Sequence, residues 1–118
     1  MKRILILITL LIGLNGVANA KVSGQDQAKV DMFAMQSESI VLKMEFFLVS
    51  PSKRSAIEIV EAMEPLKQTI RDVSEMSSMH GCLNDISCNF YFEIAMDNMD
   101  KVDYLWPKVY EVMMTNKY

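Results

Sequence analysis

The chain has 118 residues, about half of them hydrophobic, with twelve basic residues against fifteen acidic ones. This length fits one domain with a core of its own. The net charge of −3 argues against nucleic acid and anionic lipid surfaces as partners, since both bind basic surfaces. A basic protein partner, or a need for solubility, accounts better for the acidic balance.

The first twenty residues have the pattern of a secretory signal peptide. Lys2 and Arg3 form a basic start, residues 4–14 are almost purely apolar, and residues 18–20 form an A-x-A cleavage site. The apolar run is shorter than the roughly 20 residues that span a membrane. We therefore predict cleavage after Ala20 and export. The mature part, residues 21–118, is then a single domain with a net charge of −5 that does not insert into the membrane.

A first helix is expected from about Gln25 to Val49, and its apolar residues fall on two faces. One face holds Val30, Phe33, Ala34, Ile40, Val41, Met44, Phe47 and Leu48, and the second holds Met32, Met35, Leu42, Phe46 and Val49. Two narrow polar strips separate them, one with Lys29, Gln36 and Lys43 and the other with Asp31, Glu38 and Glu45. A helix with two apolar faces must be covered twice, so the second face lies inside the bundle or meets another chain.

Four polar residues, 36–39, interrupt the apolar pattern of this helix. Ser37 and Ser39 point along the two apolar faces, whereas Gln36 and Glu38 lie in the polar strips. One interpretation is that the small serines allow another helix to approach closely. The other is that the four residues form an exposed knob that enters the cleft of a partner.

Pro51 predicts that the first helix stops and a second one starts. Proline disfavours a helical conformation at the preceding residue, and it is tolerated at a first helical turn. From about Ser52, apolar residues keep helical spacing as far as Met76, across Pro65. This spacing predicts one long helix that is kinked at Pro65 and ends near Gly81.

Cys82 and Cys88 are the two cysteines of the chain, and such a pair in an exported protein is typical of a disulfide. The spacing fits neither the C-x-x-C redox motif nor a haem-attachment site. We expect an intramolecular bridge in a short loop between two helices. An intermolecular bridge and a reactive pair are the alternatives.

The last part of the chain predicts one or two more helices. Asp85 or Ser87 is expected to cap a third helix, which the polar residues 97–100 would end early. Asp103 would then cap a last helix with Pro107 in its first turn. The predicted fold is all-α, a small antiparallel bundle of three to five helices with one disulfide.

Most catalytic sites need residues that this chain lacks. His80 is its one histidine, which rules out a two-histidine zinc site and the H-E-x-x-H motif within one chain. Only two glycines lie beyond the leader, too few for a glycine-rich phosphate loop, and no G-x-S-x-G motif is present. We therefore predict a protein that is not an enzyme and has no cofactor.

Three Met-x-x-Met pairs suggest an alternative function in copper handling. The pairs are Met32/Met35, Met76/Met79 and Met96/Met99. Thioether and imidazole ligands suit Cu(I), and three-residue spacing places both sulfurs of a pair on one helix face. The alternative site would consist of Met76, Met79 and His80. The competing interpretation is that methionine serves as an adaptable filler of the core.

Without a catalytic set, an exported acidic domain held by a disulfide is expected to bind another protein. The second apolar face of the first helix predicts a homodimer interface at Met32, Met35, Leu42 and Phe46. A small periplasmic chaperone is a further alternative, and it would expose apolar surface and bind many partners.

The leader from Lys2 to Ala20, the compact mature length, the helical pattern and the single Cys82/Cys88 pair together resemble a known family. The chain is similar to small periplasmic immunity proteins that neutralise type VI secretion effectors, most of all those paired with muramidase-type cell-wall hydrolases. The resemblance covers the whole chain as a profile. It implies a periplasmic homodimer that plugs the substrate cleft of a hydrolase.

Physical requirements suggest two patches for such a plug. A muramidase cleft binds polar sugar, so rigid side chains that form hydrogen bonds should occupy it. Gln36, Ser37 and Glu38 on the first helix form one candidate patch. Asn84 and Asp85, between the cysteines, form the other.

Overall fold

The structure is a computed structural model that describes residues 22–115, so the predicted signal peptide lies outside the described residues. The described part consists of four helices: α2 (Gly24–Val49), α3 (Lys53–Ser74), α4 (Met79–Asn84) and α5 (Ile86–Thr115). No strand occurs between residues 22 and 115. The predicted all-α fold class is confirmed.

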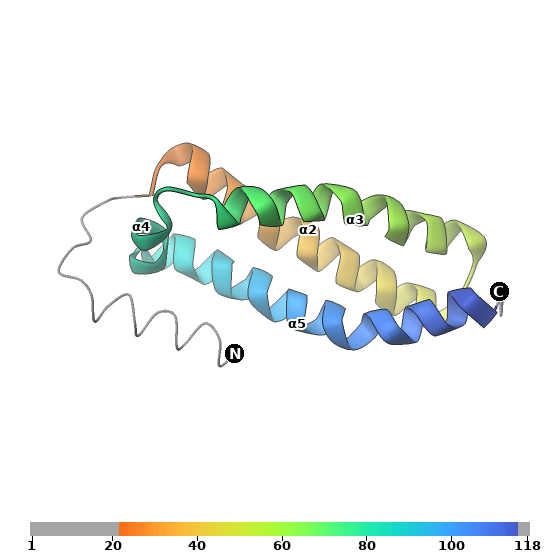
Figure 1. Cartoon of the computed structure of the whole chain (residues 1–118). Coiled ribbons are helices and arrows are strands. Elements are labelled where there is room, and N and C mark those ends of the chain that lie inside the picture. The colour runs from red at the N-terminus through yellow and green to blue at the C-terminus, as the bar shows by residue number, and fades with distance from the viewer. Residues whose placement is uncertain (1–21, 116–118) are drawn as a thin grey trace.

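The three long helices form an up-down-up bundle in which α2 packs against both α3 and α5 (Figure 1). The short helix α4 lies at the end of the bundle where the chain turns from α3 into α5. α3 and α5 make few close backbone approaches to each other. The central position of α2 explains why it needs an apolar face wider than that of a surface helix.

Serine side chains cap the N-termini of α2 and α3. The Ser23 hydroxyl accepts a hydrogen bond of 3.1 Å from the backbone N–H of Asp26, and Ser52 does the same for Ser55 at 3.0 Å. Such N-caps satisfy backbone donors that a helix leaves unpaired at its start. The predicted stop and restart around Pro51 is confirmed, and α3 continues through Pro65 as expected.

The predicted end of the second helix near Gly81 is wrong. α3 ends at Ser74, a turn follows, and Gly81 is buried inside α4. The turn allows Met76 to pack in the core and the Ser78 hydroxyl to donate a hydrogen bond to the carboxylate of Asp26. These contacts with a distant part of the chain outweigh local helix propensity.

The predicted break at residues 97–100 is also wrong, and Asp103 caps no helix. α5 runs without interruption from Ile86 to Thr115, with Pro107 inside it. Of the polar residues, Asp97 and Asp100 are exposed, whereas Asn98 is buried and donates a hydrogen bond of 3.2 Å to Ser37 Oγ. Each of these polar side chains either is exposed to water or has a hydrogen-bond partner. The helix can therefore continue through residues 97–100.

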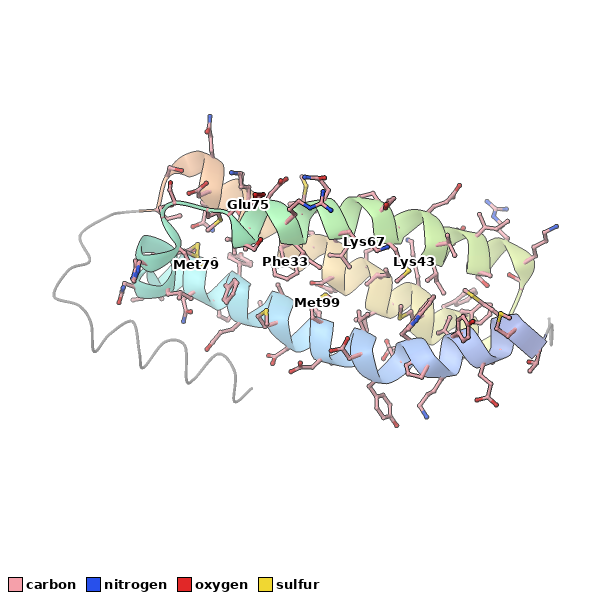
Figure 2. The ribbon with its side chains drawn as sticks, in the orientation of Figure 1. Phe33, Lys43, Lys67, Glu75, Met79 and Met99 are labelled. Carbon is pink, nitrogen blue, oxygen red and sulfur yellow. A yellow bond between two sulfur atoms is a disulfide. The ribbon has the colours of Figure 1, made fainter. Side chains whose placement is uncertain are left out.

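The inner face of α2 forms the centre of the core, as predicted. Val30, Phe33, Ala34, Ile40, Val41, Met44 and Phe47 are buried. Phe33 lies inside the bundle, where its ring meets the edge of Phe92 in α5 with centroids 6.4 Å apart (Figure 2). On α3, Ile59, Leu66 and Val73 complete the core.

The Cys82–Cys88 disulfide is confirmed, and both cysteines are fully buried. The bridge does not lie in a loop, because Cys82 belongs to α4 and Cys88 to the first turn of α5. Asp85 alone separates the two helices. Its carboxylate accepts a hydrogen bond of 2.8 Å from the backbone N–H of Cys88, which identifies Asp85 as the cap of α5.

Candidate protein-binding surfaces

The second apolar face of α2 is not covered by any other part of the described chain. Met32 is 52% exposed, Met35 71%, Leu42 57%, Phe46 62% and Val49 85%. Contiguous exposed apolar side chains of this kind mark surfaces that bind other proteins. This surface, which we name the outer face, contains all four residues of the predicted dimer interface.

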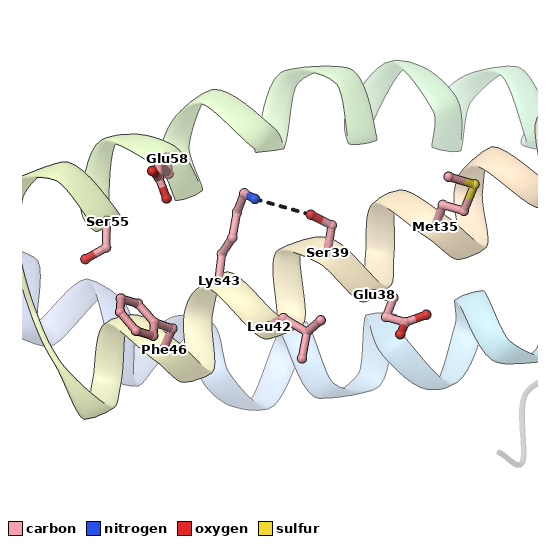
Figure 3. A pocket seen from close by; sticks show the side chains of 8 residues that line it. All are labelled: Met35, Glu38, Ser39, Leu42, Lys43, Phe46, Ser55 and Glu58. Atoms are coloured by element: carbon pink, nitrogen blue, oxygen red, sulfur yellow. Dashed lines mark hydrogen bonds between the residues drawn. The ribbon is translucent and has the colours of Figure 1, made fainter.

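Two hollows flank the outer face. The larger holds about 450 Å³ between α2 and α3, and its lining residues are Met35, Glu38, Ser39, Leu42, Lys43, Phe46, Ser55 and Glu58 (Figure 3). The smaller holds about 310 Å³ and is lined by Asp31, Ala34, Met35 and Glu38 of α2 and by Tyr91 and Ile94 of α5. Met35 and Glu38 line both hollows, so the outer face is a ridge with a depression on each side.

The predicted patch at residues 36–38 is divided by the fold. Glu38 is exposed on the ridge, and Gln36 is half-buried with no partner for its Oε1 atom within residues 22–115. Ser37 is fully buried on the inner face, where its hydroxyl donates to the Ala34 carbonyl at 3.0 Å and accepts from Asn98. The prediction of Ser37 as a partner contact is therefore wrong, and it serves close helix packing instead.

Asn84 and Asp85 are exposed at the corner between α4 and α5, directly over the buried disulfide. Asn84 Nδ2 donates a hydrogen bond of 2.9 Å to the His80 carbonyl. This bond, the Asp85 cap and the disulfide hold the corner in one conformation. The corner is thus exposed, polar and cross-linked, and the second predicted patch stays a prediction.

Two apolar side chains of this corner were not among the predicted contact residues. Ile86 is 91% exposed and Phe90 is 57% exposed, and their four-residue spacing places them on the same side of α5. The sequence pattern could have indicated their exposure, because neither residue belongs to the helical stripe of Cys88, Phe92 and Ala95, which is buried. Apolar residues outside a helix's buried stripe are candidates for contact with a partner.

A buried carboxylate fixes the corner to the start of α2. Asp26 is 7% exposed, accepts a hydrogen bond from the Ser78 hydroxyl and lies 3.3 Å from Lys29 Nζ. The hydrogen bond from Ser78 lowers the pKa of Asp26 below its ordinary value of 3.8, Lys29 adds to this effect, and burial opposes it. The segment before α4 is thus held by a charged hydrogen bond as well as by packing.

The residues of the alternative copper site lie near the same corner. Met76 is buried in the turn that follows α3, Met79 is half-buried at the start of α4, and His80 is exposed. Residues 22–115 contain no group of three or more His, Cys, Asp or Glu side chains arranged to hold a metal. Since Cu(I) uses thioether ligands, this finding does not test the copper hypothesis, which stays a prediction.

Among the helices of residues 22–115, none combines the length and the apolar composition needed to cross a membrane. Comparisons with known proteins found no matching family model, no similar curated protein and no similar solved structure.

Proposed function

We propose that this chain is an exported protein-binding inhibitor of the immunity type, which blocks the active-site cleft of a secreted peptidoglycan-degrading enzyme in the periplasm. The observation that supports this proposal is the α4–α5 corner. A corner at the end of the bundle (Figure 1) that exposes polar and apolar side chains and is cross-linked by a disulfide suits a cleft plug.

In this proposal, the corner binds the hydrolase through two kinds of side chain. Ile86 and Phe90 act as apolar anchors that are removed from water in the complex. Asn84 and Asp85 supply hydrogen bonds to groups that otherwise bind the sugar substrate. Because the bridge between Cys82 and Cys88 already orders the corner, binding loses little conformational entropy.

The corner is a better inhibitory surface than the patch on α2. Gln36 and Glu38 border an outer face whose exposed side chains are mainly apolar, and such a face suits a second copy of the chain better than a sugar-binding cleft. The proposed inhibitor is therefore a homodimer that uses the outer face for assembly and the corners for the hydrolase.

Capture from the source organism tests this function. The tagged, exported protein is incubated with periplasmic and secreted fractions, and we expect it to retain one cell-wall hydrolase stoichiometrically and in an inactive state. Ile86→Glu and Asp85→Lys should each weaken this complex at least tenfold, since hot-spot contacts exceed about 2 kcal/mol. Val60→Glu is the matched control, because Val60 is 56% exposed on α3, outside the corner.

Retention of no hydrolase, or equal affinity of both corner variants and the control, would contradict the inhibitor proposal. The exposed apolar side chains of α2 also fit the second candidate function, a periplasmic chaperone. A chaperone would retain many unrelated chains and suppress aggregation of an unfolded client protein. An inhibitor retains one folded enzyme.

A further inference from the structure

The outer face of α2, together with Ser39, follows a heptad repeat. Successive positions are three and four residues apart, and they are Met32, Met35, Ser39, Leu42, Phe46 and Val49. This spacing is that of the a and d positions of a coiled coil, which interlock with the equivalent positions of a second helix. The inner face repeats the same spacing two residues earlier, from Val30 to Phe47, and is filled by α3 and α5.

We propose that the outer face of α2 packs against the outer face of a second copy of this chain, with the two α2 helices parallel. A two-fold axis would then run along the helices and bring each residue next to its own counterpart. The proposed pair gives the homodimer a defined geometry. This pairing does not depend on the inhibitor function, because it uses a different surface from the α4–α5 corner.

The charges beside the heptad positions select the parallel direction. The strip with Asp31, Glu38 and Glu45 flanks one side of the outer face, and the strip with Lys29, Gln36 and Lys43 flanks the other. In Figure 3, Lys43 lies on the side of α3 and Glu38 on the side of α5. The helix thus has an acidic edge and an edge of lysine and amide side chains.

In a parallel pair, each edge faces the opposite edge of the partner one heptad further on. Glu38 then meets Lys43 of the partner subunit, and Asp31 meets Gln36 of the partner subunit. In an antiparallel pair that keeps all six heptad positions in contact, like edges face each other, so Glu38 would meet Glu45 of the partner subunit. The same arrangement would place Lys43 opposite Gln36 of the partner subunit, without an acidic partner, which favours the parallel pair further.

Ser39 fixes the register of the pair. It is the one small residue at a heptad position of the outer face, and it is half-buried with its hydroxyl 3.4 Å from Lys43 Nζ. On the inner face, Ser37 holds the equivalent position and allows Asn98 of α5 to approach within hydrogen-bond distance. Two Ser39 residues in one layer permit the same close approach, whereas a shift by one heptad would place Ser39 against Met32 or Phe46.

The fold removes the main cost of forming so short a coiled coil. An isolated peptide of this length would have to become helical on pairing, but α2 is already held by α3 and α5. The hollows of about 450 and 310 Å³ beside the ridge provide room for the interlocking side chains of the partner. Pairing therefore needs no rearrangement of the bundle.

Self-cross-linking tests the geometry directly. Met35→Cys and Val49→Cys lie toward opposite ends of the heptad pattern, and in the parallel pair each new cysteine lies beside its own counterpart. We expect both single variants to form covalent dimers rapidly on mild oxidation. Glu64→Cys, on the exposed face of α3, is the control and should form few. The native disulfide does not interfere, because both of its cysteines are fully buried.

A third variant, Leu42→Cys, lies near the middle of the heptad pattern, where an antiparallel pair would also bring the two cysteines close. Cross-linking of Leu42→Cys but of neither Met35→Cys nor Val49→Cys would indicate an antiparallel pair and overturn the proposal. Absence of cross-links at all three positions would show that the outer face does not pair with itself. Neither outcome affects capture of a hydrolase by the corner, so the two proposals fail independently.

Charge exchange provides a second measurement that leaves the apolar contacts intact. Glu38→Lys and Lys43→Glu each create like-charge contacts in a parallel pair and should weaken dimerisation roughly tenfold in sedimentation equilibrium. The double variant restores opposite charges and should regain most of the wild-type affinity. A double variant as weak as the two single changes combined would contradict the proposed contact.

Discussion

Asp26 places a carboxylate where water reaches it poorly, and the Ser78 hydroxyl and Lys29 hold it in the charged form. A carboxyl with a lowered pKa stabilises the folded state above its unfolded pKa, here about 3.8. This contribution is lost as the pH falls through the lower, folded-state pKa. The charged hydrogen bond thus matters at neutral pH and disappears in acid.

We expect Asp26→Asn to lower the free energy of unfolding by about 1–2 kcal/mol at pH 7, because the charged acceptor is lost. The deficit relative to the wild type should shrink as the pH falls below about 4. Urea denaturation at pH 7, 5 and 3 checks this, with exposed Asp97→Asn as the control. A deficit of equal size at pH 3 would mean that the carboxylate charge is not the cause.

The buried pair of Ser37 and Asn98 joins α2 to α5 by a single polar contact. Ser37→Ala would leave the Asn98 amide without this acceptor and should cost about 1–3 kcal/mol. Replacing both residues, as Ser37→Ala with Asn98→Leu, should cost less than the sum of Ser37→Ala and Asn98→Leu measured singly, since no donor is then left unpaired. A double-mutant cycle in urea measures the coupling, and strict additivity would show that the contact contributes nothing.

At the scale of the elements, α4 depends on its covalent link to α5. α4 has only six residues and packs at one end of the bundle, and a helix of this length is not stable by itself. The bridge joins residues six positions apart. Closing so small a ring stabilises a fold by about 2 kcal/mol in the chain-entropy treatment.

We therefore predict that Cys82→Ser together with Cys88→Ser lowers the free energy of unfolding by about 2 kcal/mol. Amide hydrogen exchange in α4 should accelerate far more than exchange in the centre of α2, because the loss of order is local. If exchange rises equally in both helices, the bridge stabilises the whole bundle and does not specifically hold the corner.

At the scale of the whole molecule, the proposed pairing of outer faces would link stability to assembly. A protein that dimerises only when folded gains stability with concentration, so its melting temperature rises with concentration. We expect this rise for the wild type and its loss in Leu42→Glu, which places a charge between the paired helices. Leu42 is 57% exposed in one chain, so the fold of the variant should persist.

Calorimetry at two widely different protein concentrations measures the melting temperature, and circular dichroism verifies that the variant is folded. Val60→Glu on α3 is the control and should keep the concentration dependence. A wild-type melting temperature that does not change with concentration would contradict dimerisation by folded chains.

Several features of the fold were determined by local sequence. Pro51 separated the first two helices because proline restricts the residue before it, and the two cysteines had no other partner in the chain. The two faces of α2 followed from helical periodicity, which also placed Met35 and Leu42 on the face that proved to be exposed. Helical periodicity and turn formation depend on residues that are close in the sequence, so both can be predicted from the sequence alone.

Other features were decided only by contacts between distant residues. α3 ends at Ser74 because Ser78 meets Asp26, and α5 continues through Asn98 because Ser37 lies opposite it. The same contact moved Ser37 from the predicted surface into the core. A polar side chain in a helix has the same local pattern whether water or a buried partner satisfies it. Tertiary packing alone determines which of the two it meets.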